Sequence, residues 1–173
     1  MMSELTMPTA IAALPRLLDN LTHMLKVAEA NAQARDIDPT VFLNARLAPD
    51  MWPLCRQVQA VAEFTKTAPY RIAGSEPPAY DGFPDSFAAC FAVIDRARAD
   101  FAKVSEADLM GKESRAFTLK MGPGDMHFTG ISYLSGFLIP NLHFHLTTIY
   151  NILRHNGVPL GKMDYFGGKK STE

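Results

Sequence analysis

Apolar side chains recur every three or four residues over most of this chain, and this spacing restricts its fold more than any other feature. Residues three and four apart lie on one face of an α-helix, so the spacing is typical of amphipathic helices. Four long stretches show it and predict helices over about residues 8–34, 51–74, 86–104 and 131–156. A chain with four such helices is expected to be mainly helical.

Residues that begin or end helices stand near these limits. Asp38 before Pro39 is a typical helix start and predicts a short extra helix that continues through residue 43. Gly74 and Gly157 follow the second and fourth stretches, where glycine commonly ends a helix. Pro15 lies inside the first stretch, so we expect a kink there or the true start of the helix.

The spacing changes between the third and fourth stretches. Arg115–Met121 and Met126–Thr129 contain residues compatible with strands. Between them, residues 122–125 read Gly-Pro-Gly-Asp, which is typical of a turn. We therefore predict a small β-hairpin immediately before the last long helix.

Together these elements predict an all-α fold: an antiparallel four-helix bundle with one short extra helix and the hairpin. The 173 residues, of which 47% are hydrophobic, suffice for one buried core. We expect a single domain over 1–173, with a core at about 6–160 and a tail at 161–173.

Composition excludes several classes of function. Seventeen basic and eighteen acidic residues give a net charge of -1, without the basic surface expected of a nucleic-acid-binding protein. No apolar run is long enough to cross a membrane, and the N-terminus has no signal-peptide pattern. Two cysteines, Cys55 and Cys90, are too few for a disulfide scaffold. A cytoplasmic protein is expected.

Two blocks of sequence resemble a known superfamily. The first is Leu43–Leu54 (LNARLAPDMWPL), which leads into Arg56–Gln59, and the second is His143–Thr148 (HFHLTT), which continues through Leu153–Lys162 (LRHNGVPLGK). They resemble an uncharacterised branch, a domain of unknown function, of the DinB/YfiT-like proteins. The resemblance covers nearly the whole chain and implies an up-down-down-up four-helix bundle and, commonly, a homodimer.

Members of that superfamily with known chemistry hold a divalent metal with three histidines. One is on the second helix, and two are on the last helix in a His-x-x-x-His pattern, since residues four apart face the same ion. In this chain the second helix has Gln57 and Gln59 but no histidine. On the last helix, His145 has Asn141 four residues before it and Ile149 four residues after it. We therefore predict no metal or other cofactor, with His145 as a weak candidate ligand if zinc or nickel does bind.

A polar group on the last helix is the main candidate site. On a helix with about 100° per residue, Asn141, His145 and Thr148 lie together on the apolar face. Buried polar groups need hydrogen-bond partners, since each unsatisfied one costs about 1–3 kcal/mol. The three side chains, with Gln57 and Gln59, either form a small-molecule pocket or satisfy one another in a structural network.

Three functions remain open at this point, and the third of them is a stress-linked interaction protein. The first is a metal-free bundle that binds a small molecule or has a purely structural role, and that forms a homodimer. The alternative is a divalent-metal-dependent enzyme, a thiol transferase or a hydrolase, with an atypical site around His145. Its catalytic residues are unknown from the sequence.

Overall fold

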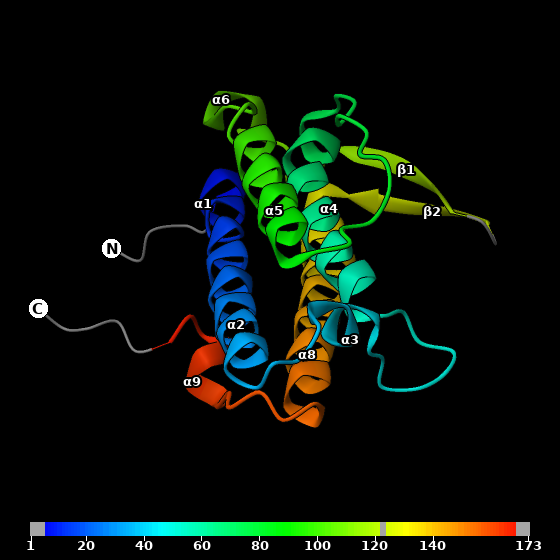
Figure 1. The fold of residues 1–173 in the computed structure, drawn as a ribbon. Coiled ribbons are helices and arrows are strands. Elements are labelled where there is room, and N and C mark those ends of the chain that lie inside the picture. The colour runs from blue at the N-terminus through cyan, green and yellow to red at the C-terminus, as the bar shows by residue number, and fades with distance from the viewer. Residues whose placement is uncertain (1–5, 122–123, 169–173) are drawn as a thin grey trace, which may run out of the picture.

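Four long helices lie side by side in the computed structural model, which describes residues 6–121 and 124–168 (Figure 1). They are α2 (Pro15–Ala34), α4 (Leu54–Ala73), α5 (Phe87–Phe101) and α8 (Ile139–His155). Shorter helices are α1 (Met7–Ala12), α3 (Pro39–Asn44), α6 (Glu106–Leu109), α7 (Gly130–Tyr133) and α9 (Lys162–Tyr165). A two-stranded sheet, β1 (Ala116–Met121) and β2 (Gly124–Thr129), completes this mainly helical fold.

The direction of the chain reverses between most of the long helices but not between α4 and α5. Residues 75–86, which we call the return segment, run back along the whole length of α4 (Figure 1). As a result α4 and α5 point the same way, whereas α2 and α8 point the other way. The return segment has three prolines, which favour this extended path.

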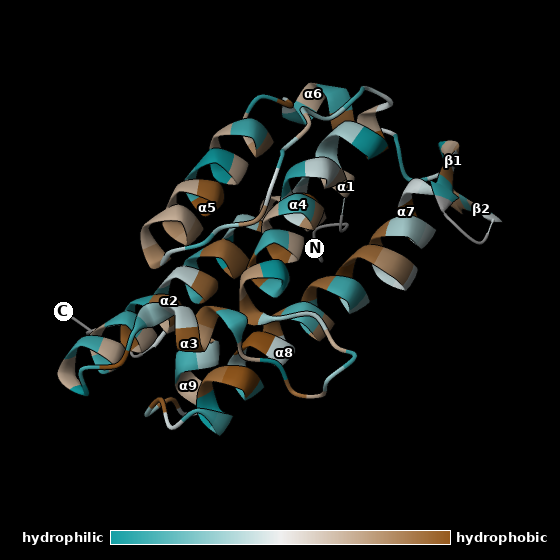
Figure 2. Ribbon diagram, turned by 45° about the vertical axis from the view of Figure 1, so that its right-hand side comes forward, coloured by the Kyte–Doolittle hydropathy of each residue, from teal (hydrophilic) through white to brown (hydrophobic). Residues whose placement is uncertain are grey.

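α4 packs most extensively against α5 and α8, and α2 packs mainly against α5. Apolar and polar bands alternate along these helices (Figure 2), as expected of helices that pack through one apolar face. The core side chains are fully or almost fully buried. Those from the long helices include Leu18, Leu21, Leu25, Val58, Val61, Ile72, Cys90, Ile94, Leu142, Leu146, Ile149 and Ile152. No helix in the described part of the chain is long and apolar enough to cross a membrane.

The first two long helices begin later than the apolar spacing predicts. Pro15 separates α1 from α2 rather than kinking one helix, because it has no N–H to continue the hydrogen-bond ladder. α4 begins at Leu54, after Pro53 in extended conformation, and not at Met51. The short helix after Asp38 is confirmed, and the Asp38 carboxylate accepts the predicted capping bond from Thr40 N–H at 2.8 Å.

The last long stretch is helical throughout, as predicted, but it is not a regular α-helix. A wide π-turn, η1 (Leu134–Leu138), separates α7 from α8, and the N–H of Ile139 donates to the carbonyl of Leu134. Pro140 follows at once, where its missing N–H and its ring are incompatible with an ordinary α-helical turn. The amide of Asn141 donates to the carbonyl of Phe137 at 2.7 Å and so satisfies a backbone group at this turn.

The hairpin is confirmed, with β1 and β2 antiparallel and Phe117 opposite Phe128. Both rings pack edge-on against the buried ring of Tyr133 on α7, at centroid distances of 5.3 and 5.7 Å. Residues 122 and 123, half of the predicted turn, lie outside the described residues.

The expected tail beyond residue 160 contributes to the packing. α9 lies against α2, where Nε2 of His23 and Oδ1 of Asp164 form a hydrogen bond at 2.8 Å. The His23 ring is the main cause of the lowered pKa of Asp164, and the backbone N–H of Gly161 adds to it. Residues 169–173 lie outside the described part of the chain.

Gly74 ends α4 in the left-handed conformation, with φ of 92°, and the guanidinium of Arg115 lies against its Cα. We expect Gly74→Ala to destabilise the fold by more than the strain of about 1–2 kcal/mol that a Cβ in this conformation causes, because that Cβ would also displace Arg115. Gly82→Ala is the matched control, since Gly82 has φ of 74° but open space around it. Equal urea-unfolding free energies for the two variants would contradict this role of Gly74.

Candidate functional site

His145 on α8 and Gln57 on α4 meet in the interior between the two helices. Nδ1 of His145 lies 2.7 Å from Oε1 of Gln57, and both side chains are buried. The sequence predicts both residues as members of one pocket or one polar network, and the structure joins them by a direct hydrogen bond. α4 and α8 are therefore linked by a polar contact within an otherwise apolar interface.

The hydrogen bonds of Gln57 fix the proton on the imidazole. The amide nitrogen of Gln57 donates to the carbonyl of Trp52 at 3.1 Å, so its oxygen faces His145 as an acceptor. Nδ1 must then be the donor, and in the neutral ring Nε2 carries the lone pair. Nε2 has no hydrogen-bond partner among the described residues. It is not among the fully buried atoms either, since only Thr65 Oγ1 is both buried and unpartnered there.

Aromatic rings surround the imidazole. Trp52 and Phe64 stack against it at centroid distances of 5.7 and 5.6 Å, and Phe144 meets it edge-on at 5.3 Å. Burial among these groups lowers the pKa of His145 below its ordinary value, because the charged form loses its hydration. The imidazole is therefore neutral at neutral pH.

The other candidates on the two helices do not join this contact. Asn141 is half-buried and bonds the carbonyl of Phe137, and the hydroxyl of Thr148 donates to the carbonyl of Phe144 at 2.7 Å. Gln59 points away from His145, since residues two apart lie about 200° apart around a helix. It lines a neighbouring cleft instead.

This cleft, which we call the aromatic cleft, has a volume of about 240 Å³. It lies between α4 and the return segment. Its walls are the side chains of Trp52, Arg56, Gln59, Ala60, Glu63, Phe64 and Phe83. Trp52 and Phe64 are also the rings that stack on His145, so the His145–Gln57 pair lies directly behind two walls of the aromatic cleft.

Arg56 supplies the positive charge of the aromatic cleft. Its guanidinium carbon lies 4.1 Å from the centroid of the Trp52 ring and 5.1 Å from that of Phe83. Such stacking holds a guanidinium in place without using its N–H donors. None of the described carboxylates forms an ion pair with Arg56. The chain therefore offers here a positioned cation whose donors are free.

The return segment is attached to α4 and α5 through Tyr80. The phenol ring lies between two cations, with Lys66 Nζ at 3.5 Å and the Arg96 guanidinium at 4.0 Å from its centroid. Its hydroxyl donates to the carboxylate of Asp100 at 2.6 Å. This attachment places Phe83, three residues further along, over the aromatic cleft.

Charged groups around Tyr80 satisfy one another despite their burial. Lys66 is fully buried and donates to Glu63 at 2.7 Å and to the carbonyl of Pro78. Hydrogen bonds from Lys103 and then Tyr80 lower the pKa of Asp100, whereas burial and the bond to Asp100 raise the pKa of Tyr80. Tyr80 is therefore a neutral donor and Asp100 an anion under ordinary conditions.

The cysteines behave as small apolar side chains. Burial raises the pKa of Cys55 and raises that of Cys90 to about 12. Neither thiol forms the thiolate that a nucleophile needs.

The groups around His145 do not fit a divalent metal. Its Nε2 is a nitrogen donor of the right kind, because Nδ1–H is held by a hydrogen bond as in many metal-ligating histidines. Its nearest ring neighbours, however, are Trp52, Phe64 and Phe144, which offer no ligand atoms. Over the described ranges, no three His, Cys, Asp or Glu side chains are grouped so that they could hold a cation.

Sequence reasoning missed Trp52, Arg56, Phe64 and Phe83 as members of a site. Phe64 could have been predicted, because it follows Gln57 by seven residues and so lies on the same helix face. Trp52 and Phe83 could not, since both precede a helix and their positions depend on the tertiary path of the chain.

Comparison with known proteins places the whole site within one family match. Residues 7–166 match a family described as a domain of unknown function (DUF1993). Among solved structures, a DinB family member protein from Shewanella denitrificans is similar, with 32% sequence identity over 94% of this chain and 92% of that one, and a TM-score of 0.82. No curated protein matches this chain in sequence.

Gln57→Ala is expected to lower the free energy of unfolding by about 1–3 kcal/mol, because it leaves the Nδ1–H of His145 without an acceptor. Gln59→Ala is the matched control on the same helix, and we expect it to change stability by less than about 0.5 kcal/mol. Urea unfolding followed by circular dichroism measures both. A loss for Gln59→Ala as large as that for Gln57→Ala would argue against a specific role of the buried bond.

The lowered pKa of His145 makes stability depend on pH. In the unfolded chain this group titrates near 6.5, whereas the folded protein resists its protonation until a lower pH. Its contribution is therefore fully present above pH 6.5 and is lost as pH falls towards and through the folded pKa. The stability difference between wild type and His145→Gln should be constant above neutrality and shrink below it. A difference that does not vary between neutral and mildly acidic pH would show that the imidazole is not buried as described.

Proposed function

The chain belongs to the family of the domain of unknown function DUF1993 and is DinB-like. Neither description names an activity, so we propose a function from the site itself. We propose that the protein binds a small planar organic acid in the aromatic cleft without a metal. The observation that carries this proposal is the guanidinium of Arg56, which lies over the rings of Trp52 and Phe83 and has no carboxylate partner among the described residues.

The lining of the aromatic cleft includes one carboxylate, that of Glu63, which is paired with Lys66, and its other groups match such a ligand. An arginine presents a planar fork of donors that suits a carboxylate, and the rings of Trp52 and Phe64 offer faces on which a planar body can stack. About 240 Å³ is enough for a molecule of the size of benzoate. The amide of Gln59 adds a polar group that can orient the ligand.

The His145–Gln57 pair acts in this proposal as a positioning element. It stacks against Trp52 and Phe64, and Gln57 also bonds the backbone of Trp52. A rigid wall reduces the ordering cost of binding. Of the sequence candidates, Gln59 then contacts the ligand and Gln57 and His145 support the wall. Asn141 and Thr148, which bond their own helix, serve structure alone.

A divalent-metal-dependent enzyme, with zinc or nickel on His145, is the rival function. The free lone pair of Nε2 favours it, because this is the atom that a ligating imidazole presents. The aromatic surroundings of the ring favour the metal-free proposal instead.

We further propose that the protein is a homodimer of DinB-type four-helix bundles. The directions of α2, α4, α5 and α8 support the bundle. Ile139 and Phe144 on α8 are exposed apolar side chains, which supports a partner surface on this helix. A sedimentation mass equal to the 19.1 kDa of one chain would contradict the dimer.

Fluorescence tests the proposed ligand, because Trp52 is the one tryptophan in the sequence. Benzoate should change its emission with a saturable dependence on concentration, whereas benzamide, the uncharged analogue, should bind at least about tenfold more weakly. Arg56→Gln should weaken benzoate to the same degree. Arg16→Gln removes an exposed arginine of α2 and should leave binding unchanged.

Equal responses to benzoate and benzamide, or equal effects of the two arginine variants, would refute carboxylate recognition by Arg56. Metal analysis of protein purified without chelator addresses the rival function. Stoichiometric zinc or nickel that disappears in His145→Ala would overturn the metal-free proposal.

A further inference from the structure

A second and larger cleft lies at the opposite end of α4 from Trp52. It has a volume of about 570 Å³ between the C-terminal end of α4, the beginning of the return segment and β1. Ten residues line it, and three of them, Arg71, Arg115 and Lys120, are basic. We call it the basic cleft. Nothing in the proposed function depends on it.

Arg115 is held rigidly at the base of this cleft. Its Nη1 donates to the carbonyls of Arg71 and Ile72 at 3.0 and 3.4 Å, which are orphan carbonyls at the end of α4. The guanidinium also lies against Gly74, where a Cβ would overlap it. These contacts use Nη1 alone, so the donors on Nε and Nη2 have no partner among the described residues.

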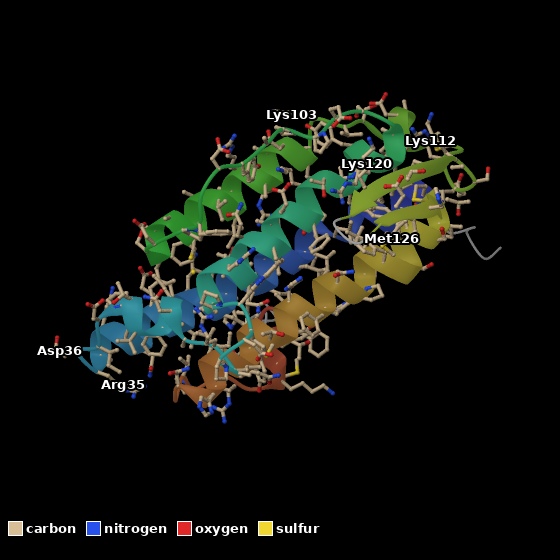
Figure 3. All side chains as sticks on the ribbon, turned by 90° about the vertical axis from the view of Figure 1, so that its right-hand side faces the viewer. Arg35, Asp36, Lys103, Lys112, Lys120 and Met126 are labelled. Carbon is tan, nitrogen blue, oxygen red and sulfur yellow. The ribbon has the colours of Figure 1, made fainter. Side chains whose placement is uncertain are left out.

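Arg71 and Lys120 bring two more cations to the same space. Arg71 Nη1 donates to the hydroxyl of Tyr133 at 3.2 Å, and its remaining donors have no protein partner in the described ranges. Lys120 on β1 is exposed and lies beside the end of α4, at the same end of the molecule as Lys112 (Figure 3).

The charges in this cleft are not balanced by the protein. Glu76 is the one carboxylate among the described lining residues, and it forms no ion pair with the arginines or with Lys120. The carbonyls at the end of α4 offset part of the charge of Arg115. Two adjacent half-buried guanidiniums and an ammonium still leave an excess of positive charge, which favours a bound anion.

The cleft is not polar throughout. Pro77, Phe117 and Leu119 are half-buried and form part of the lining. They offer an apolar surface next to the cations. Cations that come from three different segments suit a tetrahedral dianion better than a planar monoanion.

We propose that the basic cleft binds a small organic phosphate. Its phosphate group contacts Arg71, Arg115 and Lys120, and its organic group lies against Phe117 and Leu119. The fold already holds the two arginines in place, Arg115 through the end of α4 and Gly74, and Arg71 through its bond to Tyr133.

Calorimetric titration with phenyl phosphate tests the proposal at about pH 8, where a phosphomonoester is a dianion. Phenyl phosphate should bind saturably and more tightly than inorganic phosphate, because the ring covers apolar surface. Lys120→Gln should weaken binding about five- to tenfold, as expected for one lost charged contact. Glu76→Gln should tighten it, because it removes the one opposing charge.

Lys112→Gln is the matched control, since Lys112 lies at the same end of the molecule but outside the cleft (Figure 3). This variant should bind phenyl phosphate as the wild type does. In the wild type, the Nε–H NMR resonances of Arg71 and Arg115 should shift when phenyl phosphate is added. Absence of saturable binding would overturn the proposal. Equal weakening by Lys112→Gln and Lys120→Gln would overturn it too, since it would mean general charge attraction without a site.

Discussion

The hydrogen bond between His145 and Gln57 joins α8 to α4, although the two residues are 88 positions apart in the chain. It is surrounded by aromatic rings, so water competes little with it, and breaking it leaves a donor unsatisfied in an apolar place. The same bond sets the tautomer of the imidazole. The amide of Gln57 also donates to the backbone carbonyl of Trp52 and so helps to fix the position of that residue. The position of the tryptophan ring, and with it the shape of the aromatic cleft, depends on this one polar contact.

The opposite wall of the aromatic cleft depends on a different kind of interaction. Lys66, Asp100 and the ring of Tyr80 are charges and a dipole that the fold buries together. Burying ions gains little stability, because desolvation offsets their attraction. Their effect is on position: they attach the return segment through Tyr80, and Phe83 then lies near the guanidinium of Arg56. Thus the Trp52 wall is positioned by the His145–Gln57 bond, and the Phe83 wall by the charged groups around Tyr80.

The sequence was most informative where spacing along the chain determines structure. Helical periodicity located all four long helices, and Asp38, Gly74 and Gly157 marked ends that the structure confirms. Two of the limits that differ are set by proline, since Pro15 and Pro53 interrupt a spacing that continues through them. The third helix also ends earlier than predicted, at Phe101 and not at residue 104.

The site was predictable only in part. The spacing on the last helix identified His145, but it also grouped Asn141 and Thr148 with it, and these bond carbonyls of their own helix. A helical wheel shows which way a side chain points and not whether a backbone carbonyl is nearer than a tertiary partner. The cation and the rings of the aromatic cleft come together through a long irregular segment, whose path no local pattern encodes.

The wide turn at Leu134–Leu138 determines how the helix after it is rotated about its own axis. A π-turn accommodates one residue more than an α-turn, and one residue corresponds to about 100° of rotation. If the same residues formed a regular α-turn instead, everything after Pro140 would rotate by about 100°, more than a quarter circle. His145 would then leave the side of the helix that meets Gln57. The irregularity sets the phase of the final helix, and the chain tolerates an imperfect turn so that its imidazole arrives on the correct side.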